Sequence, residues 1–142
     1  HYKNELLKLV DRDTIAFNRI MAAFDLPKGT EAEKAARTEA IQDATKYAIE
    51  VPLNVMKLSY QSMEVIRAMA ETGNPNSVTD AGVAALCARA AVLGAYLNVK
   101  INASGYHDKA YTTEILTEGE ALQQMAIDRE GEILEIVNGK IG

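Results

Sequence analysis

The segment 78–103 constrains the fold most, because between Asp80 and Lys100 it carries a single charge, Arg89, and no proline. This pattern predicts one long helix that is apolar nearly all round, and such a helix lies inside a larger assembly. A membrane span is the competing interpretation, since the run 81–99 is nearly long enough to cross a bilayer. The central arginine, the weak membrane insertion of alanine and the lack of a second candidate span favour a helix in a water-soluble bundle.

Small and polar side chains recur along one face of this helix, at about 100° of rotation per residue. Such a face predicts the close approach of a neighbouring helix. Its residues are Asp80, Ala84, Cys87, Ala91, Gly94, Asn98 and Asn102. The apolar surroundings of Cys87, the only cysteine, favour a buried and unreactive thiol.

Length and composition predict one globular domain over residues 1–142, because 48% of the residues are hydrophobic and 25% are charged. The net charge of −5 argues against general binding to nucleic acid. With 2 histidines and 1 cysteine, the chain has no cluster with the spacing of a zinc site, and we expect no metal. No signal peptide or lipidation motif is visible, so we expect a cytoplasmic protein without a membrane partner. Because Tyr2 already lies in a helical pattern with no cap before it, we expect a further segment upstream.

The first helix is predicted over residues 2–24 and carries two apolar stripes. The stripe predicted to pack on a neighbouring helix is Leu7, Val10, Thr14, Phe17, Met21 and Phe24. The second is Leu6, Leu9, Asp13, Ala16, Ile20 and Ala23. Asp13 is therefore a carboxylate in an apolar stripe, where loss of solvation would let it exchange protons near neutral pH. A structural aspartate bonded to a neighbouring helix is the alternative, and the residue pattern alone favours it.

A capping box formed by Thr30 and Glu33 predicts the start of a second helix. Its apolar pattern continues to Met69, with a kink or a restart expected at Pro52. Gly73 is expected to end this helix.

Ser77 and Asp80 have the spacing of a second capping box at the start of the central helix. A turn over 103–107 and an N-cap at Asp108 predict a last helix over about 109–137. Its inward residues are expected to be Tyr111, Ile115, Leu122, Met125, Ile133 and Ile136. No segment alternates like a strand, so the fold class is all-α: a mostly antiparallel bundle of four or five helices around the alanine-rich central helix.

Two asparagines of the central helix, Asn98 and Asn102, lie four residues apart and could address one ligand or crosslink two helices. Asp80 and Asn98 share a face but are separated by about 27 Å of helical rise, so one small ligand cannot touch both. They belong to different sites, or a symmetric partner chain brings equivalent ends together. His107 beside Asp108 could titrate as a pair. The cations Lys46, Lys100, Lys109 and Arg67 are ordinary surface charges unless the fold gathers them.

Three segments together resemble the cyclodeaminase/cyclohydrolase family of folate enzymes. They are LVDRDTIAFNRIMAAFDLPKGT (9–30), the step Val51-Pro52-Leu53, and GNPNSVTDAGVAALCARAAVLGAYLNVKIN (73–102), in the family's order and with matching gaps. The chain departs from the family pattern in lacking a glycine-rich Pro-Gly-Gly-Gly-Ser segment before Tyr2. It also has Ala-Ser-Gly-Tyr at 103–106 in place of a more apolar continuation.

The resemblance implies an all-helical homodimer without a cofactor that acts in one-carbon metabolism and histidine degradation. The implied reaction is formiminotetrahydrofolate cyclodeamination, with methenyltetrahydrofolate cyclohydrolysis as the alternative and a non-catalytic dimerisation scaffold as the third possibility. We assign Asp13 as the proton-transfer group, Asp80 as a second acid or cap, and Asn74, Asn98 and Asn102 as substrate contacts. The substrate could carry a polyglutamate tail steered by surface lysines.

Overall fold

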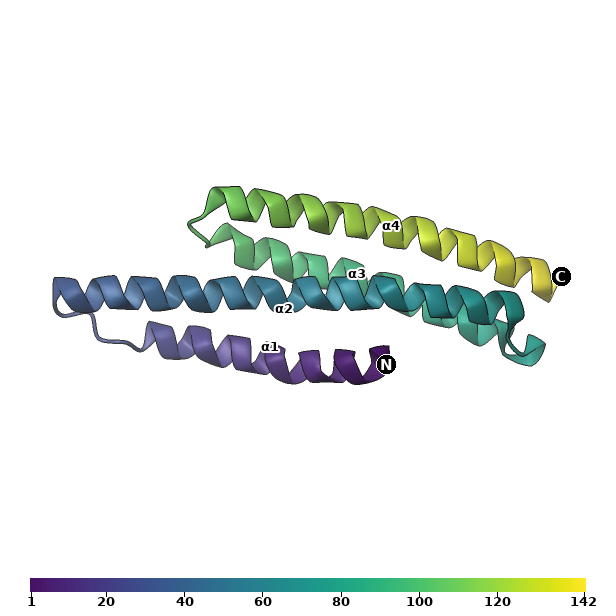
Figure 1. Ribbon diagram of the computed structural model, residues 1–142, viewed down its shortest axis with the longest axis horizontal. Helices are drawn as coiled ribbons and strands as arrows, with labels where there is room; N and C mark the ends of the chain where they lie inside the picture. The colour runs from purple at the N-terminus through teal and green to yellow at the C-terminus, as the bar shows by residue number, and fades with distance from the viewer.

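A long helix, α2 (Glu31–Thr72), is the spine on which the other helices pack. The computed structural model describes all of residues 1–142 and contains α1 (Tyr2–Phe24), α2, a short 3₁₀ turn (Pro75–Ser77), α3 (Val78–Ser104) and α4 (Lys109–Ile141). Successive helices run in opposite directions, and α1 lies along only one half of α2 (Figure 1). The predicted all-α, antiparallel architecture is confirmed.

Most of the predicted helix ends are confirmed by their hydrogen bonds. At the start of α2, the Glu33 amide donates to Thr30 Oγ1 (3.2 Å) and the Thr30 amide donates to Glu33 Oε2 (2.8 Å). The Asp108 carboxylate accepts from the Tyr111 amide (3.0 Å) and caps α4. The predicted box between Ser77 and Asp80 is wrong: Ser77 makes no side-chain cap, because the 3₁₀ turn leads directly into α3.

The continuity of α2 through Pro52 differs from the expected kink or restart. Helical structure is unbroken from Glu31 to Thr72, and the ribbon shows no sharp bend (Figure 1). Proline has no N–H, so the main-chain oxygen of Ala48, four residues earlier, lacks its usual donor. The Asn102 side chain of α3 donates to that oxygen at 2.8 Å. A neighbouring helix thereby replaces the missing hydrogen bond.

The main core lies between α2, α3 and α4. Its largest fully buried apolar side chains are Ile49, Met56, Met63, Val92, Val99 and Ile133. The Tyr96 ring packs directly on Gly119 of α4, and its hydroxyl donates to the Leu116 oxygen at 3.0 Å. Among the residues expected to point inward on α4, Met125 is exposed.

α1 is held on α2 by a small separate cluster formed by Leu9, Ala16, Ala48 and Val51. The second apolar stripe of α1 therefore makes the contact. The first stripe, which we expected to pack, is exposed at Leu7, Val10, Phe17, Met21 and Phe24. Both stripes have three-four spacing, and α2 covers only the stripe with the smaller side chains.

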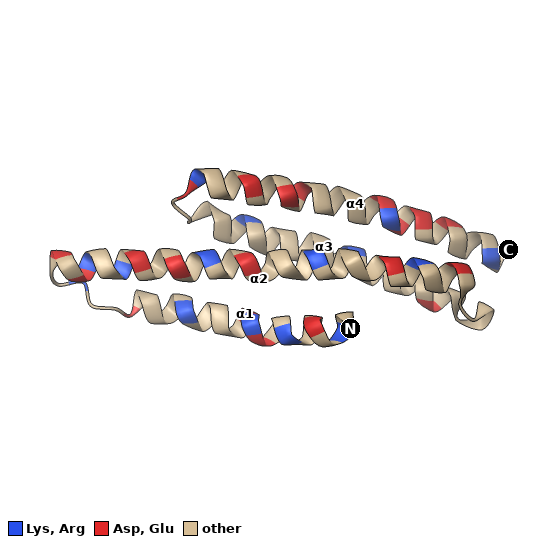
Figure 2. Ribbon diagram, viewed as in Figure 1, with Lys and Arg blue, Asp and Glu red and all other residues tan.

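One face of α3 is also uncovered, contrary to the expectation that this helix lies inside the assembly on all sides. Its exposed apolar residues include Val83, Leu86, Leu97 and Ile101. Cys87 lies on the same face and is exposed, so the predicted burial of its thiol is wrong. The charge view shows few acidic or basic residues on α3 (Figure 2), and the exposed surface is accordingly apolar.

The segment from Pro75 to Ser104 is long and apolar enough to cross a membrane by length and composition. One such helix is weak evidence for a membrane protein, because core helices of water-soluble proteins meet the same criteria. Arg89, near its middle, forms an ion pair with Glu130 of α4 (3.0 Å). The helix also packs against two long, charged helices, α2 and α4.

Candidate functional site

A groove of about 440 Å³ lies where α1, α2 and α3 meet. α1 contributes Leu6, Leu9, Val10, Asp13 and Thr14; α2 contributes Val55 and Ser59; and α3 contributes Ala91. The small side chain of Ala91, a member of the predicted small-residue face, leaves room at this position. The groove is an apolar channel with three polar side chains in its walls, which is the usual composition of a site for an organic ligand.

Asp13 lines this groove but is exposed to solvent. The prediction that the packing of α1 would shield the Asp13 carboxylate from water is therefore wrong. α2 contacts the turns of α1 before and after Asp13, at Leu9 and Ala16, and leaves the carboxylate at the rim. An exposed carboxylate beside an apolar groove can still act as a base, and a ligand bound in the groove would cover it.

Ser59 is a buried polar residue of the groove that the sequence did not reveal as a site candidate. Ser59 is 1% exposed, and its Oγ has no hydrogen-bond partner. A serine in a long helical pattern gives no signal of its own in the sequence. It is revealed only when α1 and α3 are placed on either side of α2.

Asp80 belongs to a different groove, of about 300 Å³, between the end of α2 and the start of α3. Val65, Met69 and Ala84 line it with Asp80, which is exposed. The two predicted catalytic carboxylates, Asp13 and Asp80, therefore do not meet in one pocket of this chain.

The three predicted substrate contacts lie in three different environments. Asn98 is exposed on α3, and Asn102 is half-buried and bonded to Ala48 as described above. Asn74 caps the 3₁₀ turn, because its Oδ1 accepts from the Asn76 amide (3.0 Å). The amide nitrogen of Asn102 thus crosslinks two helices, which was the alternative considered for it.

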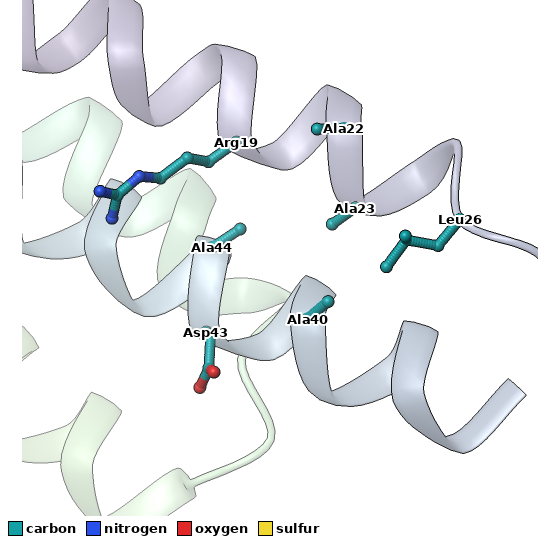
Figure 3. A pocket seen from close by; sticks show the side chains of 7 residues that line it. All are labelled: Arg19, Ala22, Ala23, Leu26, Ala40, Asp43 and Ala44. Atoms are coloured by element: carbon teal, nitrogen blue, oxygen red, sulfur yellow. The ribbon is translucent and has the colours of Figure 1, made fainter. Parts of the chain in front are cut away.

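A gap of about 400 Å³ between the end of α1 and the start of α2 is walled largely by alanines (Figure 3). Its two charged residues are Arg19, which lies over the Tyr47 ring at 4.4 Å, and Asp43, whose carboxylate points away from α1. This gap has no polar group directed into it, and we assign it no chemistry.

His107 does not pair with Asp108. Its Nδ1 lies 2.6 Å from Gln42 Oε1, which also accepts from the His107 amide (2.9 Å). Nearby, the Tyr111 ring packs edge-on against Tyr106, and Lys46 lies over it at 5.2 Å. Burial, and then the negative charge of Glu50, raises the pKa of Tyr111 to about 12.

The four predicted cations do not form one patch. Arg67 is paired with Glu71 (3.0 Å) and Glu132 (3.7 Å), while Lys100 lies over the Tyr96 ring at 4.8 Å. Lys109 donates to the main-chain oxygen of Tyr106 (2.8 Å). The steering of a polyglutamate tail by surface lysines stays a prediction.

Comparison with known proteins identifies relatives of this chain. The sequence profile of the formiminotransferase-cyclodeaminase family matches residues 1–121. Methenyltetrahydrofolate cyclohydrolase of Methylorubrum extorquens is 40% identical over 139 residues, which are 98% of this chain and 67% of that protein. Formimidoyltransferase-cyclodeaminase of Gallus gallus is 37% identical over 111 residues, which are 78% of this chain and 20% of that protein.

A solved structure, formiminotetrahydrofolate cyclodeaminase of Thermotoga maritima, has the same fold with a TM-score of 0.83 and 25% sequence identity. The match covers 99% of this chain and 66% of that one. The chain thus spans about two thirds of the two bacterial proteins and a fifth of the chicken enzyme.

Proposed function

Because the chain belongs to the formiminotransferase-cyclodeaminase family, we propose that it is a folate enzyme that hydrolyses 5,10-methenyltetrahydrofolate, with the α1/α2/α3 groove as its active site. The observation that carries this choice of reaction is the 40% identity, over nearly the whole chain, to a protein named methenyltetrahydrofolate cyclohydrolase. The groove supports the proposal because it combines apolar walls for a flat ring system with a carboxylate at its rim.

In this reaction the Asp13 carboxylate is the general base. A water molecule attacks the methenyl carbon between N5 and N10 and gives up one proton to Asp13. The positive charge of the substrate is neutralised as the tetrahedral intermediate forms. The C–N5 bond then breaks, N5 takes a proton, and the hydroxyl proton leaves as the formyl carbonyl forms. One proton is released in the net reaction, and a positioned base typically contributes about 10²- to 10⁴-fold to such a rate.

Cyclodeamination is the second candidate, favoured by the match to the Thermotoga maritima cyclodeaminase over 99% of this chain. There N10 attacks the carbon of the protonated formimino group, the C=N electron pair moves onto its nitrogen to leave an –NH2 group, and N10 gives its proton to the base. The resulting diamine takes up a proton on its primary amine and expels ammonia, which leaves the methenyl product. Both reactions need one proton acceptor beside the same carbon atom, so Asp13 has the same role in each.

Two assays separate these reactions and test the assignment. The loss of 5,10-methenyltetrahydrofolate, followed by its absorbance against an enzyme-free control, measures cyclohydrolysis. The appearance of the same absorbance from 5-formiminotetrahydrofolate, together with released ammonia, measures cyclodeamination. We expect catalysis in the first assay. Activity in the second alone would exchange the order of the two candidates, and inactivity in both would support the non-catalytic scaffold.

The partner in this proposal is a second copy of the chain, docked on the exposed face of α3. Exposed residues follow a heptad-like spacing along this face at Val83, Cys87, Ala90, Gly94, Leu97 and Ile101. An antiparallel two-fold arrangement centred near position 92 pairs 83 with 101, 87 with 97, and 90 with 94. The small residues meet in the middle and the large ones at both ends, as a self-complementary interface requires.

A further inference from the structure

We propose that the Ser59 hydroxyl is a substrate-binding group, which hydrogen-bonds a polar edge atom of the pterin ring in the α1/α2/α3 groove. This inference rests on the proposed function and adds to it a residue that neither the sequence motifs nor the comparisons select.

The first observation is that this hydroxyl has no partner within the protein. Ser59 Oγ is buried and makes no hydrogen bond, although a hydroxyl on a helix can donate to the carbonyl four residues earlier. Other hydroxyls of this chain do so: Thr14 donates to Val10, Thr45 to Ile41 and Thr72 to Ala68. A buried polar group without a partner lowers stability, so its presence calls for an explanation such as a ligand.

The second observation is the position of the hydroxyl. Ser59 lies on the α2 wall of the groove, while Asp13 lies on the α1 wall, and Val55 and Ala91 provide apolar surface beside them. A ligand in this groove would contact apolar surface through its ring and find polar groups on two walls. A pterin ring, which is flat and carries donors and acceptors along its edge, has this chemistry.

The third point is access. Less than 1 Å² of the Oγ atom is open to water in the ligand-free chain. The hydroxyl can turn toward the groove by rotation between staggered positions about its χ1 bond. α1 packs through a small cluster that is separate from the main core, and we expect it to shift outward to admit the ring. Binding therefore couples a small rearrangement to the formation of the missing hydrogen bond.

The test compares Ser59→Ala with Ser62→Ala. Ser62 lies one turn further along α2, outside the groove, and its Oγ donates to the Ser59 main-chain oxygen at 2.7 Å. For each variant we would measure KM and kcat with 5,10-methenyltetrahydrofolate, tetrahydrofolate binding by calorimetry, and the melting temperature. One neutral hydrogen bond corresponds to an expected rise of about two- to tenfold in KM and in the dissociation constant of Ser59→Ala.

The two variants are expected to have opposite effects on binding and on the melting temperature. Ser59→Ala should weaken binding, keep kcat within about twofold and leave the melting temperature unchanged or higher, because it removes a polar group that has no partner. Ser62→Ala should leave binding unchanged and lower the melting temperature.

Equal folate binding by Ser59→Ala and the wild type would overturn the role of Ser59 and leave the proposed function standing. A wild-type chain that binds no tetrahydrofolate would overturn both. A lower melting temperature for Ser59→Ala, with unchanged binding, would identify Ser59 as a purely structural residue.

Discussion

The side-chain amide of Asn102 donates a hydrogen bond to the main-chain oxygen of Ala48 at 2.8 Å, four residues before Pro52. That oxygen would otherwise have no donor, because proline cannot supply one. The bond joins α3 to α2 at the stretch of α2 that also carries α1, since Ala48 belongs to the cluster that holds α1. One asparagine therefore maintains a proline-containing helix and the relative position of three helices.

Replacing Asn102 by alanine should destabilise the protein by about 1–3 kcal/mol, because a buried carbonyl group loses its only donor. Chemical denaturation measures this change. Asn98→Ala is the matched control, four residues earlier on the same helix and exposed, and should stay within about 0.5 kcal/mol of the wild type.

A double-mutant cycle identifies the cause. In a Pro52→Ala background, the amide at position 52 can donate to the Ala48 oxygen. The loss of Asn102 should then cost clearly less than it does beside proline. Equal costs in the two backgrounds would mean that Asn102 stabilises the chain for another reason, such as packing.

Asp13→Asn should lower kcat by about 10²- to 10⁴-fold, because asparagine has the shape of aspartate but cannot accept a proton. Its melting temperature should stay near that of the wild type, since Asp13 is exposed and makes no side-chain hydrogen bond or ion pair in the chain. Asp11→Asn, on the same helix but outside the groove, is the charge-matched control and should retain full activity. Retained activity in Asp13→Asn would remove this carboxylate from the mechanism.

The helices were predictable because their signals are local. The capping box at Thr30 and the N-cap at Asp108 each depend on residues within one turn, and both form as expected. Which stripe of α1 packs depends on α2, a separate helix, and the periodicity of α1 alone could not decide between the two. The exposure of Asp13 and the lack of a partner for the Ser59 hydroxyl both depend on which stripe of α1 packs on α2.

The unfolding free energy should fall as the pH rises from about 10 to about 12, in part because of Tyr111. Burial raises the pKa of Tyr111 to about 12, so above pH 10 the unfolded chain loses this proton while the folded chain retains it. Tyr111→Phe should therefore reduce the loss of stability between pH 9 and 11, as measured by denaturation at both pH values. Identical pH dependences for the variant and the wild type would contradict this explanation.

Replacing two glycines of α4 by alanine should change the free energy of unfolding in opposite directions. At Gly119, a new Cβ would lie 2.5 Å from the Tyr96 ring, whereas Gly131 faces open space. Gly119→Ala should destabilise by about 1–3 kcal/mol, because the ring has to move. Gly131→Ala should stabilise by up to about 1 kcal/mol through helix propensity. Thermal unfolding of both variants measures the difference, and stabilisation by both would show that the ring moves at little cost.

The exposed face of α3 should carry the contact between two copies of the chain. Its thiol, Cys87, should react quickly with a thiol reagent in dilute protein and more slowly as the concentration rises, because the partner covers it. Ala90→Glu should abolish both the protection and the dimer mass measured by light scattering, while Ala121→Glu on the exposed side of α4 should affect neither. A reaction rate that is independent of concentration, in a chain that stays monomeric, would contradict the proposed interface.

The packing of α1 through a small cluster, separate from the main core, has a kinetic consequence. A segment with few buried contacts opens at a lower free energy than the rest of the molecule, so the main-chain amides of α1 should exchange with deuterium before those of α2 and α3. Because Asp13 is on this helix, a bound folate would have to hold α1 in place, and the slowing of its amide exchange would report occupancy of the groove without any measurement of turnover.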